Sequence, residues 1–135
     1  MTEDEYRTLE ELDGQNWGEP ETAPTPMVAR CLRMRRTPLY LLSQSDLRLL
    51  ISQKIGLKYI VPKAMELISK DAMIQTEYYP GDLLCALFAI DKEYWSQKTE
   101  ELKWLMSVAR SVANQYGKII GDCEGFLAAH RNKLN

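Results

Sequence analysis

The sequence contains few of the residues on which enzyme active sites and metal centres most often depend. It has one histidine, His130, and three cysteines, Cys31, Cys85 and Cys123, which lie far apart. Their spacing is not that of a zinc site or a disulfide framework. Motifs for phosphate, dinucleotide and zinc-protease sites are also missing. We therefore expect a protein that is not an enzyme, with no catalytic residues, metal or cofactor, with reduced cysteines that pack as small apolar side chains, and with an exposed or half-buried His130.

The sequence also lacks a long hydrophobic run and a strong excess of one charge. No apolar stretch approaches the roughly 18 residues that cross a bilayer, and the acidic first residues do not resemble a signal peptide. The formal net charge of −2 provides no overall field for nucleic acid or an anionic membrane. We expect a cytoplasmic protein that binds neither. A chain of 135 residues, 45% of them hydrophobic, suits a single compact domain.

What the chain has instead is an acidic first segment, residues 1–26, followed by a body, residues 27–135, that we predict to be helical. A helix over Thr2–Leu12 is expected to point Tyr6 and Leu9 into the core, and the glycines and prolines after it predict an irregular loop. In that loop Trp17 is expected to act as an anchor by burying its ring. Only Arg7 offsets eight acids in this segment, which are Glu3, Asp4, Glu5, Glu10, Glu11, Asp13, Glu19 and Glu21.

Residues 27–38, MVARCLRMRRTP, reverse the sign of the charge with four arginines and no acid. A helix here would turn Cys31 and Leu32 inward and spread the arginines over its outer face. We interpret that face as an internal ion-pair surface, neutralised by the acidic segment. A nucleic-acid site is disfavoured because four arginines are few and no aromatic residues lie between them for base stacking. Contact with a protein partner stays open.

The remaining chain shows helical periodicity and no convincing alternating strand, so the predicted fold class is all-α, with about six helices in one domain. Ser43 and Asp46 resemble a capping box that opens a helix. Pro62 predicts a helix start near Val61, because proline is tolerated in a first turn. Further helices are predicted after Pro80-Gly81, around Tyr94-Trp95, over Thr99–Tyr116 with Gly117 as its end, and over Ile120–His130.

Three runs in this chain resemble one branch of the CdiI proteins, the immunity proteins of contact-dependent growth inhibition systems. They are DLRLLISQKIGLKYIVPKAMELI (46–68), YYPGDLL (78–84) and LEELDGQNWGEP (9–20). The resemblance does not extend beyond about Lys98. It implies a protein that binds the cognate CdiA C-terminal toxin domain, commonly a nuclease, in a 1:1 complex and occludes its active site. A non-catalytic adaptor or regulatory module is the alternative, and a gene position beside an exported toxin would separate the two.

A nuclease cleft must be basic to hold phosphate, so an inhibitor is expected to offer acids and aromatic side chains to it. The motif Tyr78-Tyr79-Pro80-Gly81-Asp82 also has a structural interpretation as a turn that starts and caps a helix, and the two interpretations are compatible. From the loop 71–82 and the N-terminus we predict these toxin-binding residues, all expected to be exposed: Glu77, Tyr78, Asp82, Glu3, Asp4 and Glu5.

Overall fold

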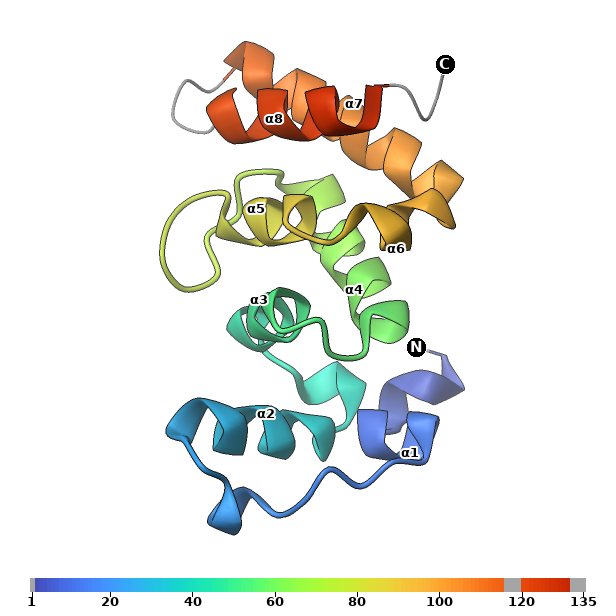
Figure 1. The fold of residues 1–135 in the computed structure, drawn as a ribbon, viewed down its shortest axis with the longest axis vertical. Helices are drawn as coiled ribbons and strands as arrows, with labels where there is room; N and C mark the ends of the chain where they lie inside the picture. Colours follow the sequence, from blue (N-terminus) through green and yellow to red (C-terminus); the bar gives the residue numbers. More distant parts are fainter. Residues whose placement is uncertain (1, 116–119, 132–135) are drawn as a thin grey trace. The chain divides into compact units, whose positions relative to one another are not determined.

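The computed structural model describes residues 2–115 and 120–131, and these residues form helices and loops without a strand. This confirms the all-α prediction, since six of the eight α-helices have seven or more residues (Figure 1). The α-helices and 3-10 helices (η) are, in order, η1 (Glu3–Tyr6), α1 (Leu9–Asp13), η2 (Pro20–Thr22), α2 (Pro26–Arg35), η3 (Leu39–Leu41), α3 (Gln44–Ser52), α4 (Leu57–Lys70), α5 (Asp82–Phe88), α6 (Lys92–Ser96), α7 (Thr99–Gln115) and α8 (Ile120–His130).

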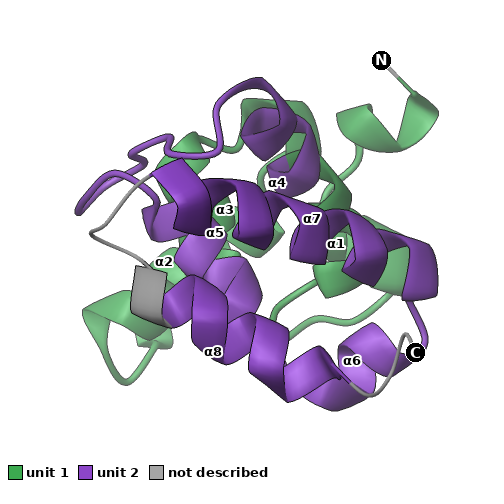
Figure 2. Ribbon diagram, turned by 90° about the horizontal axis from the view of Figure 1, so that it is seen from above, with its two compact units in different colours: residues 1–63 green, residues 64–135 purple. Residues whose placement is uncertain are grey.

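The chain divides into two compact units, residues 1–63 and residues 64–135, coloured separately in Figure 2. The division falls within α4. The prediction of a single domain stays a prediction.

The N-terminal segment of the first unit is not the continuous helix that we predicted over Thr2–Leu12. Arg7 and Thr8 are extended and separate η1 from α1. Thr8 opens α1 with a capping box, in which its hydroxyl accepts from the Glu11 N–H and the Glu11 carboxylate accepts from the Thr8 N–H. A new helix therefore starts at Thr8, and Tyr6 lies outside it with 59% of its surface exposed. Leu9 is buried as predicted.

Leu9 packs against the backbone of Gly56. A Cβ atom added to Gly56 would lie 2.7 Å from Cδ2 of Leu9, and the φ angle of this glycine is +63°. Both the space and the backbone conformation therefore favour glycine. The carbonyl of Gly56 also accepts hydrogen bonds from Tyr59 and Ile60 at the start of α4.

The capping box of Ser43 and Asp46 is confirmed at the start of α3, but the predicted start of α4 near Val61 is wrong. The helix begins at Leu57 and contains the exposed Pro62 in its interior. Proline lacks the N–H that would bond to the carbonyl four residues earlier, at Lys58. The interior of α4 therefore lacks one intrahelical bond at Pro62.

The second unit is built on the apolar stripe of α7, which packs along α8. The predicted stripe is buried at Leu102, Leu105, Met106, Ala109 and Val112. The predictions for Tyr116 and Gly117 lie outside the described residues.

Aromatic rings complete this core. The ring of Phe126 lies 4.7 Å from Phe88, 6.4 Å from Trp95 and 4.6 Å from His130 between ring centroids. His130 is only 2% exposed, so the expectation of an exposed or half-buried side chain is wrong. The physical reason is its position on the stripe of Cys123 and Phe126, at i+7 and i+4.

Candidate functional site

The loop between α4 and α5, residues 71–81, folds around the side chain of Asp82. Oδ1 of Asp82 accepts a hydrogen bond from the N–H of Thr76. Oδ2 accepts three more, from the Thr76 hydroxyl and from the N–H groups of Glu77 and Tyr78. All four measure 2.9 Å. One carboxylate thus fixes three consecutive residues of the loop.

Gly81 closes the other side of the loop. Its N–H lies 3.1 Å from the carbonyl oxygens of both Met73 and Ile74. Its φ angle of +88° is in the left-handed region, where glycine has no Cβ to clash. The turn at Pro80-Gly81 therefore starts α5 as predicted, but no side chain caps this helix, because Gly81 is its N-cap residue.

The hydrogen bonds also set the ionisation of Asp82. Burial alone would raise the pKa of this carboxyl, but the N–H groups of Tyr78, Thr76 and Glu77 and the Thr76 hydroxyl bind its charged form. Together they hold the pKa of Asp82 below its ordinary value. The side chain is therefore a carboxylate at neutral pH.

Of the three toxin-binding residues predicted from the loop 71–82, two are exposed and one is buried. Glu77 is exposed, and Tyr78 is 64% exposed. Asp82 is only 3% exposed, so the expectation that it is exposed is wrong. Its carboxylate instead accepts hydrogen bonds from backbone N–H groups of the preceding loop residues. Asp82 positions Glu77 and Tyr78 on the surface of the second unit.

The predicted N-terminal residues lie in the first unit. Glu3 pairs with Arg7 at 3.1 Å on the exposed 3-10 helix η1. Glu5 is not exposed as predicted, because Lys63 binds its carboxylate at 2.7 Å and both side chains are about four-fifths buried. Asp4 is exposed. The negative charge that these residues expose is therefore smaller than the count of acids in the sequence indicates.

An exposed apolar cluster that we did not predict lies beside these acids. The rings of Tyr6 and Tyr40 are 5.6 Å apart, and Tyr40 and Leu41 are 46% and 58% exposed. The N–H of Leu39 bonds to the carbonyl of Arg7 at 3.0 Å, which joins η3 to the end of η1. The signal in the sequence was the four-residue apolar run after Pro38, which is too short to form a helix that buries all of its members.

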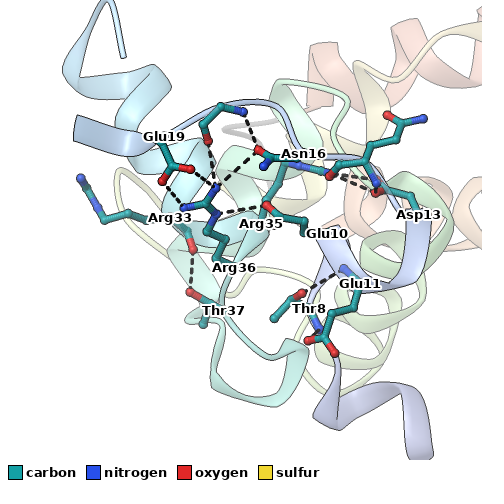
Figure 3. A network of polar contacts seen from close by, with 12 residues as sticks. Thr8, Glu10, Glu11, Asp13, Asn16, Glu19, Arg33, Arg35, Arg36 and Thr37 are labelled. Atoms are coloured by element: carbon teal, nitrogen blue, oxygen red, sulfur yellow. Dashed lines mark hydrogen bonds and ion pairs between the residues drawn. The ribbon is translucent and has the colours of Figure 1, made fainter. Parts of the chain in front are cut away.

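Three further acids of the N-terminal segment, Glu10, Asp13 and Glu19, bind arginines at the end of α2, as Figure 3 shows. Arg36, just after α2, binds Glu10 at 3.1 Å and Glu19 at 2.7 Å. Arg35 binds both carboxylate oxygens of Asp13, at 2.7 and 2.9 Å. The predicted ion pairs with the acidic segment are confirmed for Arg35 and Arg36, whereas Arg30 pairs with Asp46 of α3.

The prediction that the arginines lie on the outer face of α2 is wrong for Arg35. Its side chain is 1% exposed. The guanidinium also binds the Gln15 carbonyl at 2.8 Å and lies 3.9 Å from the centroid of the Trp17 ring. The sequence signal was its position four residues after the buried Cys31, on the same face of the helix.

Trp17 is not the fully buried anchor that we predicted, because 49% of it is exposed. One face of its ring covers Arg35, and its Nε1 donates to Gln15 at 3.0 Å. The ring therefore holds the loop through a cation–π contact and leaves its other face exposed.

The cysteines have the character of structural thiols. Burial raises the pKa of Cys31 and of Cys123, and burial together with Asp122 raises the pKa of Cys85 to about 11. Cysteine reacts as a thiolate, so a raised pKa suppresses nucleophilic chemistry. All three cysteines are free. In residues 2–115 and 120–131, no group of three or more His, Cys, Asp or Glu side chains is arranged to hold a metal ion.

Among the described residues, no helix combines the length and the apolar character that crossing a membrane requires. Searches of curated proteins and of solved structures find no significant match. A family model for CDI immunity proteins matches residues 11–105. The match covers more than half of the chain and ends within α7. It includes the loop after α1 that binds Arg35 and Arg36, and the loop around Asp82. This chain belongs to the family of CDI immunity proteins.

Proposed function

We propose that this protein binds the C-terminal toxin domain of its cognate CdiA in a 1:1 complex in the bacterial cytoplasm and neutralises it without catalysis. The toxin domain would be a nuclease, and the complex would occlude its active site. The observation that carries the proposal for the site is the display of Glu77 and Tyr78 on a loop fixed by four hydrogen bonds to Asp82. Membership of the immunity family supports the toxin as partner.

A fixed loop is well suited to tight binding. Ordering a flexible segment on association costs free energy, and the bonds to Asp82 order residues 76–78 before the partner arrives. Tyr78 offers a large contact area with little side-chain entropy to lose. Glu77 adds negative charge next to it, which complements the basic cleft that a nuclease needs for its phosphate substrate. The loop therefore combines an aromatic anchor with a steering charge.

The N-terminal surface is proposed as a second contact. Glu3 and Asp4 would contribute charge, although the pairing of Glu3 with Arg7 reduces its field. Glu5 would act through the structure, because its carboxylate is held by Lys63. We therefore expect Glu77 and Tyr78 to have larger effects on toxin binding than the three N-terminal acids.

The test is co-purification with the toxin domain encoded next to this gene, followed by calorimetry for the stoichiometry and a nuclease assay with and without this protein. Tyr78→Ala should weaken binding by at least about tenfold, and Glu77→Gln should lower the association rate. Glu100→Gln is the matched control, since Glu100 is a well-exposed acid of the same unit, paired with Lys103 on α7. It should bind like wild type.

Salt dependence tests the electrostatic part of the proposal. Raising salt from about 50 to 500 mM shortens the Debye length from above 10 Å to a few ångströms, which should slow association with the wild type more than with Glu77→Gln. Wild type that does not bind the neighbouring toxin domain would refute the proposed function. Binding with an association rate independent of salt and of residue 77 would place the interface elsewhere.

A further inference from the structure

A pocket of about 650 Å³ opens in the second unit between α5 and α8, beside the loop that carries Tyr78. The loop contributes Tyr79 to its lining, α5 contributes Cys85 and Phe88, and α8 contributes residues that include Asp122 and Phe126. Tyr79 is therefore shared by the pocket and by the loop that we propose as the toxin contact. A partner bound over Tyr78 would lie beside the opening.

The lining combines aromatic surface with negative charge. The rings of Phe88 and Phe126 stack 4.7 Å apart. The lining also includes two carboxylates, Asp91 and Asp122, against the single ammonium of Lys92. Asp122 is exposed, and its Oδ2 accepts a weak hydrogen bond from the Cys85 thiol at 3.5 Å.

The field of Asp122 has a visible effect on its neighbours. Burial is the main cause that raises the pKa of Tyr79, Cys85 is the next, and the charge of Asp122 adds a smaller contribution in the same direction. The thiol of Cys85 responds in the same direction. Both groups are therefore protonated and neutral at physiological pH, and neither adds a negative charge that would compete with Asp122 for a cation. A positively charged group in this pocket would meet a carboxylate beside aromatic rings.

We propose that this pocket receives an arginine or lysine side chain of the toxin domain, an inference that rests on the proposed function. The aliphatic part of such a side chain packs favourably on aromatic surface, and its charged end is attracted both to the rings and to a carboxylate. The charged end would bind Asp122 in a charge-assisted hydrogen bond. A basic nuclease surface supplies side chains of this kind around its cleft. The pocket is thus a second determinant of toxin binding next to Tyr78, and it is selective for a cationic side chain.

Gly125 provides a direct way to close the pocket. This residue lines it, lies in α8 with an ordinary backbone conformation, and has nothing within 4 Å of an added Cβ. Gly125→Leu should therefore fill the space without distorting the helix, and leucine is also the better helix former. Ala128→Leu is the matched control, because Ala128 is an exposed small residue of the same helix outside the pocket lining.

The experiment measures the affinity of each variant for the isolated toxin domain by calorimetry, with a thermal melt of each variant alone. Gly125→Leu should weaken binding by at least about tenfold, while Ala128→Leu binds like wild type. Asp122→Asn should also weaken binding and reduce its salt dependence. Should Gly125→Leu melt below wild type, Asp122→Asn decides the matter alone.

Wild type that binds the toxin domain, together with Gly125→Leu and Asp122→Asn variants that bind within about twofold of it, would overturn the pocket and leave the proposed function standing. Absence of binding by wild type would overturn the proposed function itself, and the pocket proposal with it.

Discussion

Arg35 and Asp13 form a bidentate ion pair in which the two partners differ greatly in exposure. Two nitrogens of the guanidinium reach two carboxylate oxygens at 2.7 and 2.9 Å. The Arg35 side chain is 1% exposed, whereas that of Asp13 is 31% exposed. The pairing lowers the pKa of Asp13, chiefly through the hydrogen bonds from Arg35. The arginine therefore depends on a partner that remains accessible to solvent.

Removing the aspartate should cost more than removing the arginine. Asp13→Ala leaves a buried guanidinium without its carboxylate and should lower the free energy of unfolding by about 2–4 kcal/mol. Arg35→Met removes the buried charge while keeping apolar volume, so its loss should be smaller. Urea denaturation of both variants measures the difference. Glu21→Ala, at an exposed acid of the same segment, is the control and should stay within about 0.5 kcal/mol of wild type.

The carboxylate of Asp82 should make stability depend on acid pH. Its pKa in the folded protein is below the ordinary value of about 3.9, so the ionised form stabilises the fold above that value. This contribution is lost as the pH falls through the folded pKa. Asp82→Asn should therefore be destabilised at pH 6 and should approach wild type towards pH 3. Denaturation midpoints across this range test the sign, and a constant difference between the two proteins would contradict it.

The same substitution should release the loop. The amide of asparagine places donors where Thr76, Glu77 and Tyr78 already donate, so some of these N–H groups lose their acceptor. Hydrogen exchange at the three amides should accelerate more than in α7. A variant whose loop amides exchange like wild type would show that Asp82 does not hold the loop.

Gly56 and Gly14 allow two effects of a methyl group to be separated. Both have φ angles near +65°, but only at Gly56 would a Cβ meet another atom, at 2.7 Å from Leu9. Gly14→Ala should cost about 1–2 kcal/mol through its backbone conformation alone. Gly56→Ala should cost at least about 1 kcal/mol more, because overpacking against Leu9 adds to the same backbone cost. Equal losses in the two variants, measured by chemical denaturation, would contradict the packing effect.

Replacing Trp17 and Trp95 by alanine should cost different amounts of stability, because the two side chains differ in burial. Trp95 is fully buried, so Trp95→Ala should lower stability by about 3–5 kcal/mol. Trp17→Ala removes a half-exposed ring and one cation–π contact, so about 1–2 kcal/mol is expected. Thermal melts of the two variants test the order. If Trp17→Ala melts like wild type and binds the toxin weakly, its exposed face is a contact surface.

Helical periodicity predicted the parts of this fold that one element specifies by itself. The stripe of α7 and the capping box at Ser43 depend on residues within a turn or two of each other, and both are as predicted. The family resemblance likewise came from local runs, and the family match covers these runs from residue 11 onward. Such features can be predicted from the sequence because they do not depend on a distant contact.

The errors arose where the outcome depends on contacts that the side-chain pattern does not show. The burial of Arg35 depends on Asp13, 22 residues earlier, and the exposure of Trp17 depends on the same arginine. Pro62 was placed in a first turn because nothing in the local sequence shows that Gly56 starts the helix. Asp82 is buried because backbone N–H groups of Thr76, Glu77 and Tyr78 bind its carboxylate, and no side-chain pattern in the sequence reveals such bonds.

The order in which the chain is synthesised determines when the ion pairs of Arg36 and Arg35 can form. Arg36 binds Glu10 and Glu19, and its neighbour Arg35 binds Asp13, so in every one of these pairs the acid is synthesised before its arginine. While the ribosome extends the chain through residue 34, the acidic segment has neither arginine, and its carboxylates repel one another. The loop can close only when both arginines have left the exit tunnel. A nascent chain arrested before that point should remain open to proteases between α1 and α2, and one arrested with Arg35 and Arg36 outside the tunnel should resist them.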